Sequence, residues 1–64
     1  MGSFLGYSVI EWNEAGGPAE FPSGAWIDQT AEDVYLQKDI HEDRAAEAGR
    51  DDAYGIVSIY REED

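Results

Sequence analysis

The chain has 64 residues and no cysteine. Neither a disulfide nor a thiolate metal site can therefore stabilise it. A domain of this size buries only about 60% of the surface that its unfolded chain exposes, so we expect marginal stability. Length alone predicts one small domain over residues 1–64, and we expect residues 62–64 to form a frayed tail.

Basic residues are also scarce. The chain has four Lys and Arg residues and 15 Asp and Glu residues, which gives a formal net charge of −11. This balance argues against direct binding to nucleic acid, which needs a basic footprint, and against anionic membrane surfaces. Such an imbalance costs self-repulsion in the compact state. We infer that its reason is a basic partner, a saline cytoplasm or solubility alone.

Long hydrophobic runs are absent. No stretch approaches the roughly 18 apolar residues of a transmembrane helix. The start of the chain, Met1-Gly2-Ser3-Phe4, lacks the basic and hydrophobic regions of a signal peptide, so we expect a cytoplasmic protein. Hydrophobic residues still make up 42% of the chain, which is too many for a disordered acidic tail and predicts a folded domain.

Aromatic and β-branched residues predict strands over 4–12 and 53–61. Apolar residues occupy both faces of 4–12, which favours a central strand. Glycine and proline interrupt residues 13–23 and predict a long loop. Residues 24–28 resemble a second, short strand.

A helix is predicted between these strands, over about 31–48. Thr30 and Asp33 resemble a capping box at its start, and Gly49 is a C-terminal stop signal. An alternative is that residues 34–40 form a strand and that only 41–48 are helical.

The apolar residues of this helix are poorly segregated. We expect one side to face the sheet and Leu36 and Ile40 on the other side to be exposed. The residues expected to face the sheet are Val34, His41, Ala45 and Ala48.

The order β-β-α-β predicts a small α+β two-layer sandwich. A right-handed crossover makes the second and third strands parallel, and the first strand fits between them. The predicted architecture is a three-stranded, mainly antiparallel sheet of order 2-1-3 with one helix packed on one face.

No pattern of a catalytic or cofactor site is present. His41 is the only histidine, and no serine lies in a nucleophile elbow. The acids do not match a calcium loop, and no glycine-rich phosphate loop is found. We therefore predict no enzymatic activity, no metal and no cofactor, and we expect His41 at the edge of the core.

Carboxylates follow one another along one flank of the predicted helix. Asp39, Asp43 and Glu47 are successive i,i+4 neighbours, and like charges at this spacing destabilise a helix. The row resembles a line of phosphates, although a charge run is most often a solvated face. The predicted partner-binding residues are Glu32, Asp39, Asp43, Glu47, Asp51 and Asp52, together with Leu36 and Ile40.

Two functions fit this surface. The first is a non-enzymatic protein that binds a basic surface of another protein, as an inhibitor or regulator of a nucleic-acid-binding protein, by analogy with phage DNA mimics. The second is an accessory or interaction domain with apolar partner contacts, whose acidity is a halophilic or solubility adaptation. We expect a monomer or a weak dimer, because the acidic row opposes self-association. Among the aromatic residues, Trp26 is expected in the core, and Trp12 is either core or a partner anchor.

Overall fold

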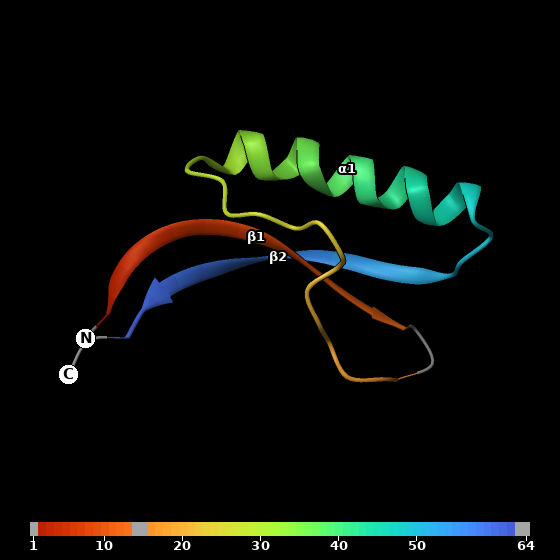
Figure 1. Ribbon diagram of the computed structural model, residues 1–64, viewed down its shortest axis with the longest axis horizontal. Helices are drawn as coiled ribbons and strands as arrows, with labels where there is room; N and C mark the ends of the chain where they lie inside the picture. Colours follow the sequence, from red (N-terminus) through yellow and green to blue (C-terminus); the bar gives the residue numbers. More distant parts are fainter. Residues whose placement is uncertain (1, 14–15, 63–64) are drawn as a thin grey trace.

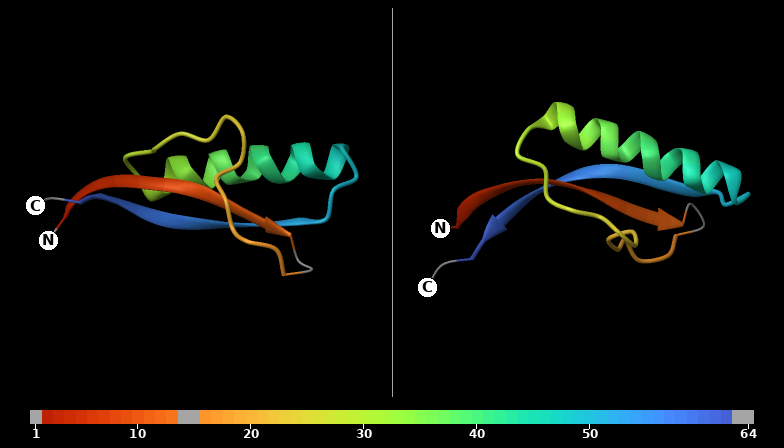
Figure 2. Two further views of the ribbon diagram at one scale, coloured as in Figure 1. Left: turned by 60° about the horizontal axis from the view of Figure 1, so that its bottom comes forward. Right: turned by 45° about the horizontal axis from the view of Figure 1, so that its top comes forward.

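The computed structural model describes residues 2–13 and 16–62 of the chain. Its elements are strand β1 (Ser3–Asn13), helix α1 (Ala31–Glu47) and strand β2 (Asp52–Arg61). The strands pair antiparallel, and α1 lies across one face of the sheet (Figures 1 and 2). The predicted small α+β fold with one helix on one face is confirmed. Residues 63–64 of the predicted tail lie outside the described residues, and Glu62 is exposed.

The predicted third strand is wrong. In the described residues the sheet has two strands, and the segment before the helix meets the outer edge of β1 only at the isolated bridges Tyr7↔Asp28 and Glu11↔Glu20. Three residues of β1, 8–10, separate these bridges, whereas seven residues, 21–27, separate them in the segment. The additional residues of the segment form a turn in which the Ala25 N–H donates to the Pro22 carbonyl. A regular ladder cannot form across this turn, because proline has no N–H to donate. We call residues 20–28 the edge segment.

Alternation along the strand predicts that Leu5 and Tyr7 share one face, but a bulge near the start of β1 changes this. The register shifts between Phe4 and Gly6, which places the Phe4 ring 5.2 Å from the Tyr7 ring. Phe4, rather than Leu5, therefore shares the side of Tyr7. Gly6 has φ of +146°, and a Cβ there would lie 2.4 Å from the Asp28 carbonyl oxygen. Only glycine permits this close approach of the edge segment.

Helix α1 begins and ends where local signals place it. The Thr30 hydroxyl accepts a hydrogen bond from the Asp33 N–H at 3.2 Å, as a capping residue does. At the other end Gly49 has φ of +70°, and the Gly49 and Arg50 N–H groups donate to the Ala46 and Ala45 carbonyls. This pattern is a Schellman motif. The predicted helix is confirmed with its end at Glu47, and the alternative of a strand over 34–40 is wrong.

The core lies between α1 and the sheet. Its fully buried apolar side chains are Val9 of β1 and Val34 of α1, with Ala45 nearly so. The sheet-facing side of the helix was predicted correctly for Val34, His41 and Ala45, all of which are buried. It was wrong for Ala48, which caps the helix and is exposed because the chain turns there.

Gln37 is the largest fully buried side chain, with 1% of its surface exposed. Its Nε2 donates to the Trp26 carbonyl at 3.1 Å and to Asp28 Oδ2 at 2.7 Å, while its Oε1 accepts from the Trp26 N–H at 3.2 Å. These bonds tie the edge segment to α1. They satisfy backbone groups that the irregular edge leaves without a ladder partner.

The two tryptophans lie at the surface of the fold. Trp26 was expected in the core, but half of its surface is exposed, and its indole Nε1 donates to Asp28 Oδ1 at 2.8 Å. The Gln37 bonds hold its backbone against α1 and leave the ring outside. Trp12 lies over Gly55, where an added Cβ would approach the ring to 3.2 Å.

Candidate protein-binding surface

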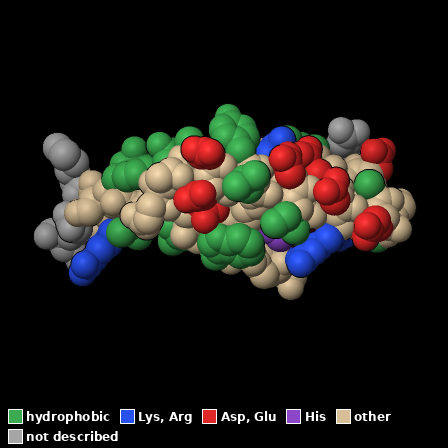
Figure 3. Space-filling model, turned by 90° about the horizontal axis from the view of Figure 1, so that it is seen from above, with side chains coloured by type: hydrophobic (Ala, Val, Ile, Leu, Met, Phe, Trp, Pro, Cys, Tyr) green, Lys and Arg blue, Asp and Glu red, His purple; other side chains and the backbone are tan. Residues whose placement is uncertain are grey.

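A row of carboxylates runs along the outer face of α1. Glu32, Asp39, Asp43 and Glu47 are all exposed, and we call these four residues the acidic strip. Acidic side chains gather over this helix in the space-filling view (Figure 3). At 1.5 Å rise per residue, i,i+4 neighbours lie about 6 Å apart along the axis. The strip therefore presents a linear series of negative charges to solvent.

The carboxylates of the acidic strip form no ion pair within the described residues. In the described part of the chain, ion pairs join Lys38 Nζ to Glu42 Oε1 at 3.4 Å and Arg50 Nη1 to Asp52 Oδ2 at 3.7 Å. Neither pair includes a strip carboxylate. Like charges at i,i+4 spacing destabilise a helix by a few tenths of a kcal/mol per pair, and in the described residues no ion pair to a strip carboxylate offsets that cost.

Apolar side chains lie beside the strip. Leu36 is 60% exposed and Ile40 is 43% exposed, as the sequence predicted. They are one turn apart on the side of α1 away from the sheet. By helical spacing Leu36 lies next to Glu32 and Asp39, and Ile40 lies next to Asp43. Charged and apolar groups thus share one accessible face, which is the composition of a protein interface with a hydrophobic centre and a polar rim.

The two aspartates that follow the helix do not simply prolong the strip. The chain reverses direction after Gly49 and enters β2, which runs back beneath α1 (Figure 1). Asp51 is exposed at this reversal. Asp52 is partly buried as the first residue of β2 and pairs with Arg50. Of the eight predicted residues, six lie together on α1 and two lie at its C-terminal end.

His41 belongs to the buried side of the same helix. Only 4% of it is exposed, and its ring stacks on Tyr54 of β2 at a centroid distance of 6.1 Å. Burial lowers the pKa of His41, and the Arg44 guanidinium lowers it further, so the imidazole is neutral near pH 7. Burial together with a hydrogen bond to Glu11 raises the pKa of Tyr54 to about 12.

The structural role of Gln37 was not predicted from the sequence. The signal was present, because Gln37 is three residues after Val34 and four before His41, on the sheet-facing side. A glutamine is usually exposed, and its burial here depends on Trp26 and Asp28, which no periodicity indicates.

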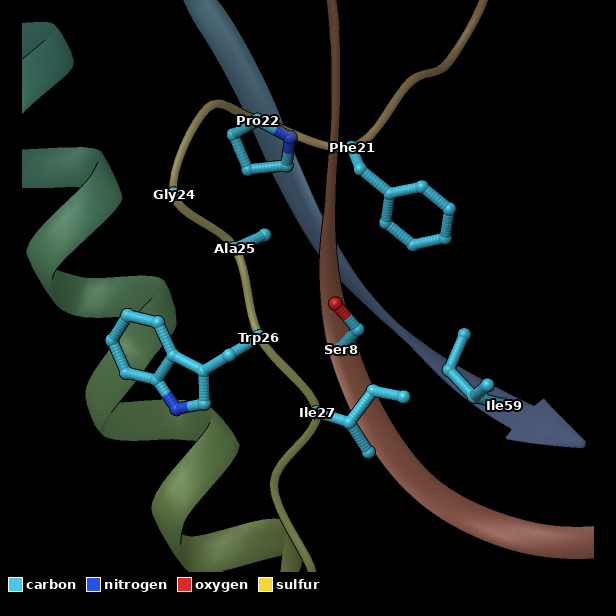
Figure 4. A pocket seen from close by; sticks show the side chains of 8 residues that line it. All are labelled: Ser8, Phe21, Pro22, Gly24, Ala25, Trp26, Ile27 and Ile59. Atoms are coloured by element: carbon cyan, nitrogen blue, oxygen red, sulfur yellow. The ribbon is translucent and has the colours of Figure 1, made fainter.

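The sheet face opposite α1 carries a shallow apolar hollow of about 450 Å³, formed with the edge segment (Figure 4). Trp26 and Ile27 project to opposite sides of that segment, with Trp26 toward the helix. Phe21, Ile27 and Ile59 line the hollow, and Phe21 and Ile27 are 57% and 45% exposed. This is a second accessible apolar surface, distinct from Leu36 and Ile40.

Comparisons with protein families, with curated proteins and with solved structures gave no match. In the described residues no helix is long and apolar enough to cross a membrane. Within 2–13 and 16–62, no three His, Asp or Glu side chains are grouped as a metal ion would require.

Proposed function

We propose that this non-enzymatic, acidic protein binds a basic surface of another protein through the acidic strip and through Leu36 and Ile40. The partner is a nucleic-acid-binding protein, which the bound domain inhibits or regulates by occupying its basic groove as a DNA mimic does. The observation that supports this proposal is the row of four exposed carboxylates, without basic partners in the described residues, beside two exposed apolar side chains.

Electrostatics favours recognition over stability as the reason for this row. Uncompensated like charges destabilise the helix that carries them, whereas a basic partner removes the repulsion on binding. Leu36 and Ile40 are candidates for the desolvated centre of the interface, with the carboxylates around them. The protein acts in the cytoplasm as a monomer, or as a weak dimer that salt promotes by screening.

The test is a pull-down from host lysate with the tagged domain at low and at high salt, followed by identification of the eluted proteins. The captured partner is then titrated with the domain. We expect the affinity to fall steeply with salt and the triple variant Asp39→Asn, Asp43→Asn, Glu47→Gln to bind at least about tenfold more weakly. If the domain acts as a DNA mimic, it also displaces nucleic acid from the partner.

A matched control separates the strip from the total charge. The double variant Asp39→Asn/Asp43→Asn removes two strip charges, and Glu20→Gln/Glu62→Gln removes two exposed charges outside α1. We expect a clear loss for the first pair and less than about a twofold loss for the second. Equal losses, or unchanged binding in the triple variant, would show that the strip is not the recognition surface.

A second candidate function is supported by the exposed apolar residues. Phe21 and Ile27 on one side of the molecule and Leu36 and Ile40 on the other fit an accessory domain with apolar partner contacts. Its acidity would then be an adaptation to salt or solubility. Such a domain unfolds near zero added salt and regains structure in molar KCl. A cooperative melt in dilute buffer that changes little in high salt argues for the first function.

A further inference from the structure

The outer edge of β2 has no partner among the described residues. The sheet has the order β1-β2, so each strand has one outer edge. On β1 that edge is covered by the edge segment, which bonds to Tyr7 and Glu11. In the part of the chain that the structure describes, no backbone hydrogen bond from outside the sheet reaches β2. An unpaired strand edge of this kind is a template for another strand.

The bonds of β1 identify which backbone groups of β2 face outward. Tyr7 and Glu11 each donate one bond to the edge segment and accept one from it, so both point away from β2. In an antiparallel pair, the residues opposite them also point away from the partner strand. These residues are Ser58 and Tyr54, and Ile56 lies midway between them. The N–H and C=O groups of Tyr54, Ile56 and Ser58 thus face outward, and those of the residues between them bond to β1.

Nothing in β2 protects this edge. Soluble proteins usually block an exposed edge with charged side chains, a proline or a bulge. Residues 53–60 contain no charged residue and no proline, and the bulge of the sheet lies in β1. Ser58 and Tyr60 are exposed and Ile56 is partly exposed, so the strand is open to solvent. The edge is therefore suited to pairing with another strand.

We propose that β2 pairs antiparallel with β2 of a second copy of this chain, about a two-fold axis at Ile56. In this register Ile56 lies opposite Ile56 of the second copy, and Tyr54 lies opposite Ser58. The outward N–H and C=O groups of each copy then meet those of the other. Because the axis is perpendicular to the sheet, the two sheets join into a continuous one with the same faces.

The charges at the ends of β2 favour a second copy in this register. Arg61 then lies opposite Asp51 of the other copy, and Arg50, which meets Asp52 of its own chain at 3.7 Å, lies opposite Glu62. By symmetry each of these pairs occurs twice. Opposite charges across antiparallel strands stabilise the pairing, and like charges destabilise it. The neighbouring registers that keep the outward groups paired lose these contacts, and one of them places Asp52 opposite Glu62.

The acidic strip limits the strength of this dimer. Helix α1 covers one face of the sheet, so both copies of the helix lie on the same side of the joined sheet (Figure 2). Each chain carries −11, and the two copies repel each other. We therefore expect a weak dimer that salt strengthens by screening this repulsion. The strip stays accessible to another protein, because the pairing uses the edge of β2 and not the outer face of α1.

Amide hydrogen exchange, measured by NMR at several protein concentrations in high salt, tests the pairing. In the monomer the bonds to β1 protect the amides of Gly55 and Val57, whereas those of Tyr54, Ile56 and Ser58 exchange readily. Raising the concentration should protect the second set. In a mixture of labelled and unlabelled chains, an intermolecular contact between the Hα atoms of Gly55 and Val57 identifies the register. No self-association at about 1 mM protein, or protection that does not alternate along β2, would overturn the proposal.

Exchange of the two end charges tests the register by sedimentation. Asp51→Arg places arginines opposite each other, and we expect about five- to tenfold weaker association, although its lower net negative charge favours association. Arg61→Asp should weaken association as well. The double variant Asp51→Arg/Arg61→Asp restores opposite charges and should come within about twofold of the unmodified chain.

Glu20→Arg is the matched control, since it makes the same charge change as Asp51→Arg at an exposed position of the edge segment. It should not weaken association, because it lies away from the edge of β2 and lowers the net negative charge. The register is wrong if Asp51→Arg associates as well as Glu20→Arg, or if the double variant is as weak as the single ones.

Discussion

Replacement of Gln37 by methionine tests the bonds that hold the edge segment against α1. Methionine has a similar length and is flexible enough to fill the site, so the change removes hydrogen bonds without opening a large cavity. Three bonds are lost, from the Trp26 N–H, to the Trp26 carbonyl and to the Asp28 carboxylate. Each contributes roughly 0.5–1.5 kcal/mol net, and the bond to the charged group contributes more.

We expect Gln37→Met to lower the free energy of unfolding by about 2–3 kcal/mol. At about 4–8 °C per kcal/mol for a domain of this size, the melting midpoint falls by roughly 10–20 °C. Urea titration followed by far-UV circular dichroism measures the change. The control is Gln29→Met, which removes one exposed bond to the Leu5 carbonyl and should cost less than about 1 kcal/mol.

A second variant at the same position, Gln37→Glu, tests the neighbouring charge. The new carboxylate lies against Asp28 and cannot donate a hydrogen bond, so its pKa in the folded state rises above the unfolded value. The variant is therefore least stable near pH 7 and approaches Gln37→Met as the pH falls toward 4. A loss below about 0.5 kcal/mol for Gln37→Met would refute the argument, because the edge segment would then not depend on these bonds.

Three further predictions follow from other parts of the fold. Replacing Leu36 and Ile40 by Ser should change the melting midpoint little, because both are exposed; a large loss would place them in the core. Gly6→Ala should lower the free energy of unfolding by more than about 2 kcal/mol in urea titrations, because the new Cβ would lie 2.4 Å from a carbonyl oxygen. The control Gly16→Ala, whose Cβ would have no atom within 4 Å, should cost about 1 kcal/mol. Because the pKa of Tyr54 is raised to about 12, this tyrosine ionises first in the unfolded chain, and the protein should lose stability between about pH 10 and 12. Thermal melts at each pH should show a smaller loss of stability for Tyr54→Phe over this range.

The parts of the fold that depend on neighbouring residues were predictable from the sequence. Thr30 and Gly49 each act on backbone groups within one helical turn, so they indicated both ends of α1. The strands β1 and β2 were recognised from their composition, because aromatic and β-branched residues dominate both.

The edge of the sheet was not predictable in the same way. Residues 24–28 have the composition of a strand, but pairing requires a matching number of residues between bridges, and a turn at Pro22 breaks that match. The burial of Gln37 and the exposure of Trp26 have one cause, since the amide of Gln37 bonds the backbone of Trp26. Hydropathy cannot predict that a glutamine is buried and a tryptophan exposed, because both depend on a contact between residues that are distant in sequence.

The exposed positions of the acidic strip were predictable from helical spacing, and its role in binding stays a prediction. A polar cavity of about 280 Å³ between the C-terminal half of α1, the sheet and the edge segment was not recognisable from the sequence. Glu11 and Tyr54 are opposite each other in the strand pairing, and His41 and Arg44 of α1 line the cavity with them. The edge segment and the turn after α1 also line it, so five segments meet there, and contacts between segments distant in the chain leave no local sequence pattern.

The pairing of β1 with β2 also determines how the chain must fold. Every pair in the sheet joins a residue before α1 to a residue after it, from Asn13↔Asp52 to Ser3↔Arg61. The loop that closes the sheet thus contains the edge segment and the whole helix, and loop closure precedes the stabilising contacts. On the ribosome, β1 therefore has no strand partner until nearly all of these residues have been synthesised. Until then α1, with its uncompensated carboxylates, has no sheet to pack against.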